Sequence, residues 1–325
     1  MKVELVLALL LLAATARGAA VPPDAGALLV AALSSPTTGY TAQGRIQSFA
    51  PGRKPKALGM AVYFLPDGRL RREVRLRPNL PPEQVFLDDG SNRRLYWPKL
   101  GTEWSGTMTH ESAAERAARL RSLYDVSVST GGRVAKRATW RLDLRAPGGG
   151  LRRALWVDRA SGLLLKCEEY RLDGSLLRRE RLTALVAGTP DGSLFKLAVP
   201  AGTPEAPMTA PRGAAPPGAG FPRWIPEGFL ALESRLEDSG RAFVVTYGDG
   251  VDTFILRETS EAQSGGGEKS GRPLRLKDGS RASLSGGKDG PVLEFRSRGR
   301  TYAVMGDIIE DEMLRLADSF GEARP

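Results

Sequence analysis

Leu151–Leu185, LRRALWVDRASGLLLKCEEYRLDGSLLRRERLTAL, contains three short runs rich in Leu, Val, Trp and Tyr, and this stretch decides the fold. Two separators, Asp158–Gly162 and Asp173–Gly174, divide the runs, and each supplies a glycine for the positive φ of a tight reversal. Because Arg, Lys and Glu are interspersed with the apolar residues, we expect a β-meander with one face on a core and the other in water. Such a meander needs a second surface to pack against, and Tyr40–Trp97 has the alternation to provide one.

The rest of the chain repeats the hairpin signal. Seven Asp-Gly dipeptides occur, which favours antiparallel hairpins over βαβ crossovers. Helical periodicity is confined to Ala25–Leu33, Glu111–Tyr124 and Ile309–Phe320, with Asp24 and Asp307 as expected N-caps of the first and last. The sequence therefore predicts an α+β protein that is mostly antiparallel β.

Composition bounds the size of the protein and the class of its partners. With 325 residues and 41% hydrophobic content, the chain has the length of about two domains. Its net charge of +10 favours anionic partners without naming one. The single cysteine, Cys167, excludes an intramolecular disulfide and a thiolate metal cluster. We expect a small buried apolar side chain there, with a reactive thiol as the alternative.

The first twenty residues have the pattern of a secretory signal peptide. Lys2 is followed by the apolar run Leu5–Ala14 and then by small residues typical of a cleavage site. The run is too short to span a bilayer, and no second one follows, so we expect no transmembrane segment in the mature chain. No cysteine stands at the expected cleavage site, so we expect no cysteine-acylated lipoprotein. We expect an exported protein, and export argues against a nucleic-acid partner.

The residues that could support catalysis are few. The chain has one histidine, His110, and one cysteine, and it lacks a G-x-S-x-G nucleophile elbow. His and Cys are also too scarce for a metal site, and Gly265–Gly267 lacks the Walker spacing. We therefore predict no enzyme, no catalytic residue, no metal and no cofactor. An exported hydrolase, the alternative, would need a polar cleft of convergent carboxylates.

Aromatic and basic residues on the predicted strands each allow two interpretations. The apolar set is either ordinary sheet core or the lining of a concave cavity. Its candidate lining residues are Tyr63, Val74, Leu76, Phe86, Trp97, Trp104, Trp140, Leu142 and Trp156. The basic set is either a solvated strand face or a rim for lipid phosphates or acidic segments of a partner. Its candidate residues are Arg71, Arg75, Arg77, Arg178 and Arg179.

Several motifs resemble one known family. YDVSVSTGGRVAKRATWRLDLRA (Tyr124–Ala146) and the meander carry it in the first half, where Trp156, Asp158, Ser161, Gly162 and Leu163 form the W-x-D-x-x-[ST]-G-L pattern of LolA and LolB lipoprotein carriers. WIPEGF (Trp224–Phe229), YGDGVDTFIL (Tyr247–Leu256) and YAVMGDI (Tyr302–Ile308) resemble the small C-terminal domain of the MucB/RseB family. The motif residues there are Trp224, Pro226, Gly228, Phe229, Tyr247, Asp249, Gly250 and Gly306. The chain departs from the family in its Gly- and Ser-rich segment 260–290 and in Gly248, where the family usually has Ser.

The resemblance implies an architecture. It implies a LolA/LolB-like half-open β-barrel with covering helices at 21–199, after a signal peptide at 1–20. A Pro-, Ala- and Gly-rich linker or pinned surface crossing at 200–222 then leads to a small α+β C-terminal domain at 223–325. Within that domain we expect 260–290 to be a long loop around one weak strand, Leu274–Leu276.

The resemblance also implies a function. It implies a periplasmic regulator of a sigma factor in the envelope stress response. Such a protein binds the periplasmic part of a membrane anti-sigma factor, shields it from proteolysis and releases it when an acyl-chain or lipopolysaccharide-type ligand binds. The alternative is a periplasmic carrier or chaperone for lipoproteins or lipids. An adjacent sigma and anti-sigma gene pair would favour the regulator, and uptake of acyl chains by the delipidated protein would favour the carrier.

Overall fold

The computed structural model describes residues 21–77, 79–99, 101–107, 111–197, 199–203, 205–207, 220–237, 241–260, 271–287, 290–306 and 308–320. The predicted signal peptide, His110 and Asp307 lie outside the described residues. No helix among the described residues is long and apolar enough to cross a membrane.

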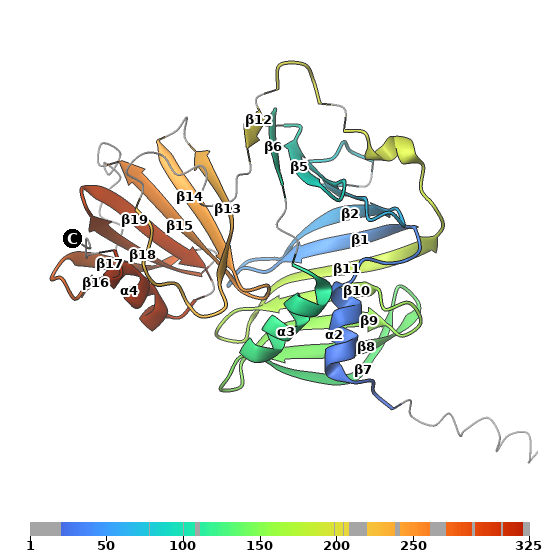
Figure 1. Ribbon diagram of the computed structural model, residues 1–325, viewed down its shortest axis with the longest axis horizontal. Helices are drawn as coiled ribbons and strands as arrows, with labels where there is room; N and C mark the ends of the chain where they lie inside the picture. The colour runs from blue at the N-terminus through green and yellow to red at the C-terminus, as the bar shows by residue number, and fades with distance from the viewer. Residues whose placement is uncertain are drawn as a thin grey trace, which may run out of the picture.

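Two sheets make up most of the molecule and lie beside one another (Figure 1). The first has twelve strands: β1 (Tyr40–Ser48), β2 (Lys56–Phe64), β3 (Leu70–Arg75), β4 (Gln84–Asp88), β5 (Asn92–Trp97), β6 (Thr102–Thr107), β7 (Asp125–Val134), β8 (Arg137–Arg145), β9 (Leu151–Asp158), β10 (Leu164–Tyr170), β11 (Leu176–Ala187) and β12 (Glu205–Pro207). Their order is β12-β6-β5-β4-β3-β2-β1-β11-β10-β9-β8-β7. Neighbours are antiparallel except for β12, which runs parallel to β6. The predicted α+β, mostly antiparallel class is confirmed.

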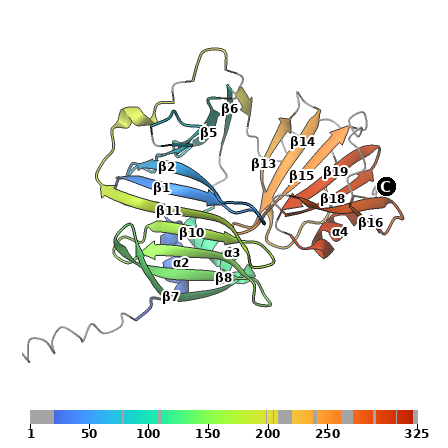
Figure 2. The same ribbon diagram turned by 180° about the vertical axis from the view of Figure 1, so that it is seen from behind.

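The second sheet has seven strands in the order β13-β14-β15-β19-β18-β17-β16 (Figure 2). They are β13 (Leu230–Glu237), β14 (Ala242–Gly248), β15 (Thr253–Ser260), β16 (Arg272–Arg275), β17 (Arg281–Gly287), β18 (Gly290–Ser297) and β19 (Arg300–Gly306). The segment 260–290 was expected to hold one weak strand, but it contributes both β16 and β17, which pair around Asp278-Gly279. The prediction was wrong there because Gly and Ser obscured the alternation of Ala282 and Leu284 with Arg281 and Ser283.

The meander closes on the N-terminal hairpins as expected. β9, β10 and β11 pair in sequence, and β11 then pairs with β1, so the two halves of the first sheet are continuous. The expectation that one face of the meander is exposed to solvent is wrong for β9. Leu155 and Val157 belong to one buried cluster, and Ala154 and Trp156 belong to another. The strand is buried on both faces because α2 and α3 cover one face, while on the other face the curvature packs it against strands of its own sheet.

Two helices cover one region of the first sheet. α2 (Ala25–Leu33) begins at Asp24, whose Oδ1 accepts a hydrogen bond from the Ala27 backbone N–H at 2.9 Å. α3 (Ala113–Leu123) begins at Ser112, which forms a capping box with Glu115. The two helices lie side by side across β7–β9 (Figure 1). Their buried cluster contains Leu28, Leu29, Leu120, Leu142, Leu155 and Val157.

The first sheet is open and curved. Its end strands, β7 and β12, are not hydrogen-bonded to each other, which agrees with the predicted half-open barrel. The segment expected as a linker contributes β12 and the described residues 200–203, while 208–219 lie outside the described part. In the second sheet, α4 (Glu310–Asp318) packs Met313, Leu316 and Ala317 into the core. Its N-cap is Ile309, without a side-chain cap.

Candidate inter-sheet groove and its junction

A tight turn of the second sheet docks into the first. The turn, Asp249–Asp252, joins β14 to β15, and we call it the junction turn. Asp249 Oδ1 accepts hydrogen bonds from the backbone N–H groups of Val251 at 2.7 Å and Asp252 at 2.8 Å. Gly250 has φ +97°, which glycine adopts without strain. Val251, at the tip, is only 5% exposed because it joins the core under α2 and α3.

Polar side chains of the first half hold both carboxylates of this turn. The Tyr124 hydroxyl, just after α3, donates a hydrogen bond to the Asp249 carboxylate. The Arg152 guanidinium on β9 donates from Nε to Asp252 Oδ2 at 2.9 Å. Each contact joins residues at least 100 positions apart in the chain. The junction is therefore a tertiary contact between the two sheets.

Arginines also hold the backbone of the junction turn. Arg119 on α3 donates to the carbonyl oxygen of Asp249. Arg153 on β9 donates to the carbonyl oxygens of Gly250 at 2.8 Å and Val251 at 2.7 Å. Every residue of the turn thus contacts the first sheet or its helices.

Burial perturbs the titratable groups of the junction. Burial is the main cause that raises the pKa of Tyr124, and Asp252 and Asp249 raise it further. Burial also raises the pKa of Asp252, although hydrogen bonding and the charge of Arg152 act in the opposite direction. Burial, with smaller contributions from Asp252 and Asp249, raises the pKa of Glu312 on α4. These shifts identify the junction as a partly dehydrated site.

Beside the junction, the two sheets enclose a groove of about 550 Å³, which we call the inter-sheet groove. The first sheet contributes the β1–β2 hairpin and residues of β10 and β11. The second contributes the ends of β15, β18 and β19. The lining residues are Ser48, Phe49, Ala50, Arg53, Lys54, Lys56, Glu169, Leu177, Arg178, Thr253, Ile255, Gly290, Val292, Met305 and Gly306. Figures 1 and 2 show the β1–β2 hairpin reaching toward the second sheet.

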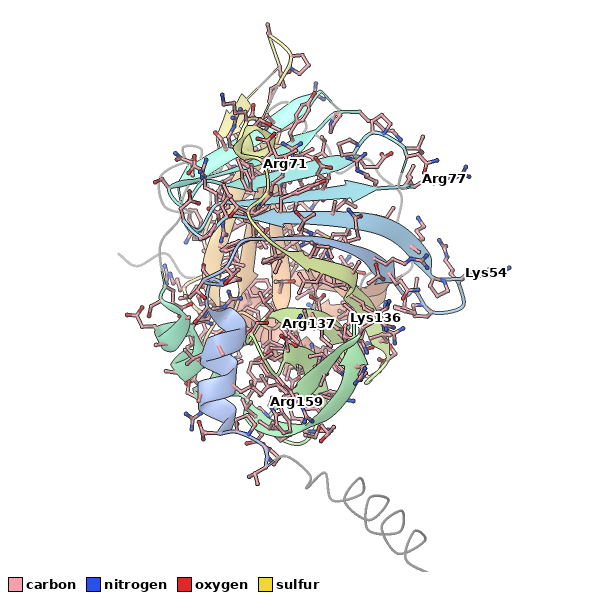
Figure 3. The ribbon with its side chains drawn as sticks, turned by 90° about the vertical axis from the view of Figure 1, so that its right-hand side faces the viewer. Lys54, Arg71, Arg77, Lys136, Arg137 and Arg159 are labelled. Carbon is pink, nitrogen blue, oxygen red and sulfur yellow. The ribbon has the colours of Figure 1, made fainter. Side chains whose placement is uncertain are left out.

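The two walls of the inter-sheet groove differ in chemistry. The first-sheet wall carries Arg53, Lys54 and Lys56, all exposed, and Figure 3 shows Lys54 at the tip of its hairpin. None of these three side chains forms an ion pair with a described residue. The second-sheet wall presents the half-buried side chains of Ile255, Val292 and Met305, with no charged residue among its described lining. The groove therefore suits a ligand with acidic and apolar groups.

A second groove of about 510 Å³ lies on the surface of β1–β3. Small residues of β2 line it, and so do two of the predicted cavity residues, Tyr63 and Leu76, together with Arg75 and Arg77. Leu76 is 50% exposed.

The structure does not bring the nine predicted cavity residues together. Trp140 and Leu142 belong to the core under the helices, whereas Val74 and Trp156 belong to a separate core. Tyr63 packs against the small cluster around Phe195, in the 3₁₀ helix η1 (Gly192–Phe195). Phe86 and Trp97 are half-buried on β4 and β5, and the Trp104 side chain lies outside the described part.

The predicted basic rim is mostly neutralised by neighbouring carboxylates. Arg71 and Arg75 both pair with Glu73, at 2.6 and 2.5 Å. Arg178 pairs with Glu180, and Arg179 pairs with Glu168 at 2.6 Å. Arg77 forms no ion pair with a described residue, and Figure 3 shows it far from Arg71. These arginines line no single rim, although Arg178 lines the inter-sheet groove.

The predicted C-terminal motif residues occupy three places. Asp249 and Gly250 belong to the junction turn, and the space above Gly228 is filled by Leu123 of α3. The rings of Tyr247 and Phe229 contact Phe254 at centroid distances of 4.8 and 5.2 Å. Gly306 faces Phe254 so closely that a Cβ would lie 2.5 Å from the Thr253 carbonyl oxygen. Trp224 lies beneath the Arg315 guanidinium at 4.3 Å, and the Pro226 carbonyl closes the turn to Phe229.

Sequence reasoning missed two residues of the junction turn, Val251 and Asp252, and its partners Tyr124, Arg152 and Arg153. One signal was available, since Val251 is a large apolar residue inside an Asp-Gly turn, where a polar residue is usual.

Comparison with known proteins now bears on this arrangement. Residues 101–203 match the family model of the MucB/RseB N-terminal domain. Residues 101–203 therefore belong to the MucB/RseB N-terminal domain family. A comparison with curated protein sequences found no match.

Solved structures of MucB share the fold of this chain across both sheets. MucB in complex with MucA(peri) is 19% identical with a TM-score of 0.58, and the match covers 92% of this chain and 100% of that one. The MucA/MucB complex of Pseudomonas aeruginosa is 20% identical with a TM-score of 0.57, and the match covers 93% of this chain and 100% of that one. A structure of MucB is 18% identical with a TM-score of 0.53, and the match covers 93% of this chain and 98% of that one.

Proposed function

We propose that this chain is a non-enzymatic periplasmic regulator that holds the periplasmic part of a membrane anti-sigma factor in the inter-sheet groove. The observation that carries the proposal is the groove itself, which needs both sheets and pairs a basic wall with an apolar wall. The partner segment then carries acidic side chains toward Lys54 and Lys56 and apolar side chains toward Ile255 and Met305. Shielding of this segment from proteolysis follows from its enclosure.

Two further observations support this function. MucB, whose solved structures match both sheets of this chain, has been crystallised with MucA(peri). The basic wall is also free to receive charge, since its lysines form no ion pair with a described residue. Opposite charges at a binding surface speed association and exclude wrong partners.

The β1–β3 groove favours a second role, the sensing or carriage of lipids. Apolar residues such as Leu58 and Met60 line it beside Arg77, which forms no ion pair with a described residue and is available to an acidic headgroup. An acyl-chain or lipopolysaccharide-type ligand in this groove would then signal envelope stress and release the partner. The carrier alternative uses the same groove with lipid as cargo.

Binding of the partner can be tested by titration calorimetry. The mature chain is titrated with the periplasmic part of a membrane anti-sigma factor from the same organism. Lys54→Glu combined with Lys56→Glu should weaken binding about tenfold or more, because it opposes acidic groups with like charge. Lys136→Glu is the control, since Lys136 is exposed on the β7–β8 turn and does not line the groove. Absence of binding, or equal binding by both variants, would contradict the proposal.

A further inference from the structure

Arg153 links the junction turn to the inter-sheet groove through one side chain. Its Nη1 donates to the Gly250 carbonyl oxygen at 2.8 Å, and its Nη2 donates to the Val251 carbonyl oxygen at 2.7 Å. The same Nη2 lies 3.2 Å from Glu169 Oε1, and Glu169 lines the groove. A guanidinium is a planar fork of donors in fixed geometry, so these acceptors are held in one arrangement.

The junction turn continues directly into the apolar wall of the groove. Asp252 ends the turn, and Thr253, the next residue, begins β15 and lines the groove. β15 pairs with β19 through Phe254 and Gly306, and Ile255 pairs with Met305. The backbone pairing of β15 with β19, in register from Phe254 to Ser260, holds these two strands together. A shift of the turn therefore moves the apolar wall as one body relative to the basic wall.

The turn has the properties of a two-state contact. All of its anchors come from four consecutive residues, so they form and break together. Undocking would expose Val251, which is buried with Leu120 and Leu155, and would leave the Arg153 guanidinium without its two carbonyl acceptors. Nη1 and Nη2 of Arg152 and Nε of Arg153 are already buried without a hydrogen-bond partner, so loss of the two carbonyls would add to the unpaired donors here.

We propose that the junction turn sets the width of the inter-sheet groove, with Arg153 as its positioning residue, so that turn docking and partner binding stabilise each other. This inference rests on the proposed function. The two events share one free energy of coupling. Any change that undocks the turn therefore lowers the affinity for the partner, and a bound partner stabilises the docked turn.

The test combines partner affinity with a distance between the sheets. Nitroxide labels on Lys136→Cys and Arg281→Cys, both at exposed positions outside the groove, report the distance by pulsed electron paramagnetic resonance. Burial raises the pKa of Cys167 to about 12, so its thiol stays unreactive at neutral pH while the introduced cysteines are labelled.

Two variants weaken the junction turn, and one matched variant does not touch it. Arg153→Lys keeps the charge and loses the fork, and Val251→Ala trims the buried tip. Val85→Ala is the control, because Val85 on β4 is 2% exposed and lies in neither groove. We expect Arg153→Lys and Val251→Ala to broaden the distribution of distances between the two labels and to lower the affinity for the partner about fivefold or more. Val85→Ala should lower stability to a similar extent and change neither quantity.

The outcomes separate the two proposals. If Val251→Ala leaves the distance unchanged, or weakens the partner no more than Val85→Ala does, the coupling is wrong; this variant decides if Arg153→Lys does not fold. Lys54→Glu combined with Lys56→Glu should lower the affinity for the partner without altering the distance between the two labels. If that double variant binds the partner normally, the proposed function fails, while the distance measurement still reports on the turn.

Discussion

Two turns of the molecule begin with the same chemistry and serve different ends. Asp158 opens the β9–β10 turn, and its Oδ2 accepts hydrogen bonds from Ser161 N–H at 3.0 Å and Ser161 Oγ at 2.5 Å. Asp249 opens the β14–β15 turn and accepts from the backbone N–H groups of Val251 and Asp252. Both carboxylates are almost fully buried, at 2% and 3% exposed.

The two turns differ in which further partner the aspartate side chain contacts, beyond the residues of its own turn. Asp158 pairs at 2.7 Å with Arg137, at the start of the neighbouring strand β8, so the turn stays within its own sheet. Asp249 accepts from Tyr124, which belongs to the other half of the molecule. Turn chemistry is therefore local, whereas the tertiary partner decides whether a turn only reverses the chain or joins two sheets.

The largest expected effect breaks the junction. Arg152→Ala removes the charge partner of Asp252 at a site where the two side chains are 2% and 14% exposed. An uncompensated buried carboxylate costs about 3 kcal/mol, which denaturant unfolding of the whole chain would measure. Arg152→Met combined with Asp252→Asn should recover most of this loss, because neither charge then remains. A double variant as unstable as Arg152→Ala would show that the charge pair is not what matters.

A smaller effect compares a hydroxyl across the junction with one inside a sheet. Tyr124→Phe removes the donor to the buried Asp249 and should lower the free energy of unfolding by about 2 kcal/mol. Tyr170→Phe removes a donor to Glu168, which keeps its bonds to Lys166 and Arg179, so about 1 kcal/mol or less is expected. Thermal or urea unfolding of both variants measures the difference. Equal losses would remove the distinction between the two regions.

The smallest effect is a difference in the pH dependence of stability between the two carboxylates. Burial alone would raise the pKa of Asp158, but hydrogen bonds from Arg137 and Ser161 outweigh it and lower the pKa overall. Its stabilising contribution is present above the unfolded pKa of about 3.9 and is lost as the pH falls through the lower folded value. The stability gap between the native chain and Asp158→Asn should therefore shrink in acid.

Asp252 should behave in the opposite way. Its pKa is raised, mainly by burial, so the folded state favours the protonated carboxyl. That contribution is full below the unfolded pKa and is lost as the pH rises through the folded value. The stability of the native chain relative to Asp252→Asn should therefore increase as the pH is lowered from 7. Parallel changes for the two variants would contradict the assignment of the two environments.

Much of the fold was predictable because its signals are local. Five of the seven Asp-Gly dipeptides, at Asp67, Asp89, Asp173, Asp249 and Asp278, close hairpins between consecutive strands. Asp191 instead begins η1, where its side chain accepts the Ser193 N–H, and Asp289 lies outside the described residues. Turn residues and alternation act over a few positions, so one sequence suffices to read them.

The candidate site was less predictable because it depends on which faces meet. Alternation correctly placed Trp140 and Leu142 on one face of β8, but it could not tell that Trp156 belongs to another core. The junction depends on contacts such as Tyr124 with Asp249, 125 positions apart. No periodicity within one segment encodes such a pair. The basic hairpin residues Lys54 and Lys56 stand in an ordinary polar turn until the second sheet is placed opposite them.

The most direct test of the central claim is site-specific photocrosslinking of the complex. A benzophenone side chain is placed at Lys54, Met305 or Lys136 in turn, and the labelled chain is irradiated with the periplasmic part of the anti-sigma partner. The inter-sheet groove predicts crosslinks to the partner from Lys54 and from Met305, on opposite walls, and none from Lys136. Crosslinks from Lys136 alone, or from neither wall, would contradict the account.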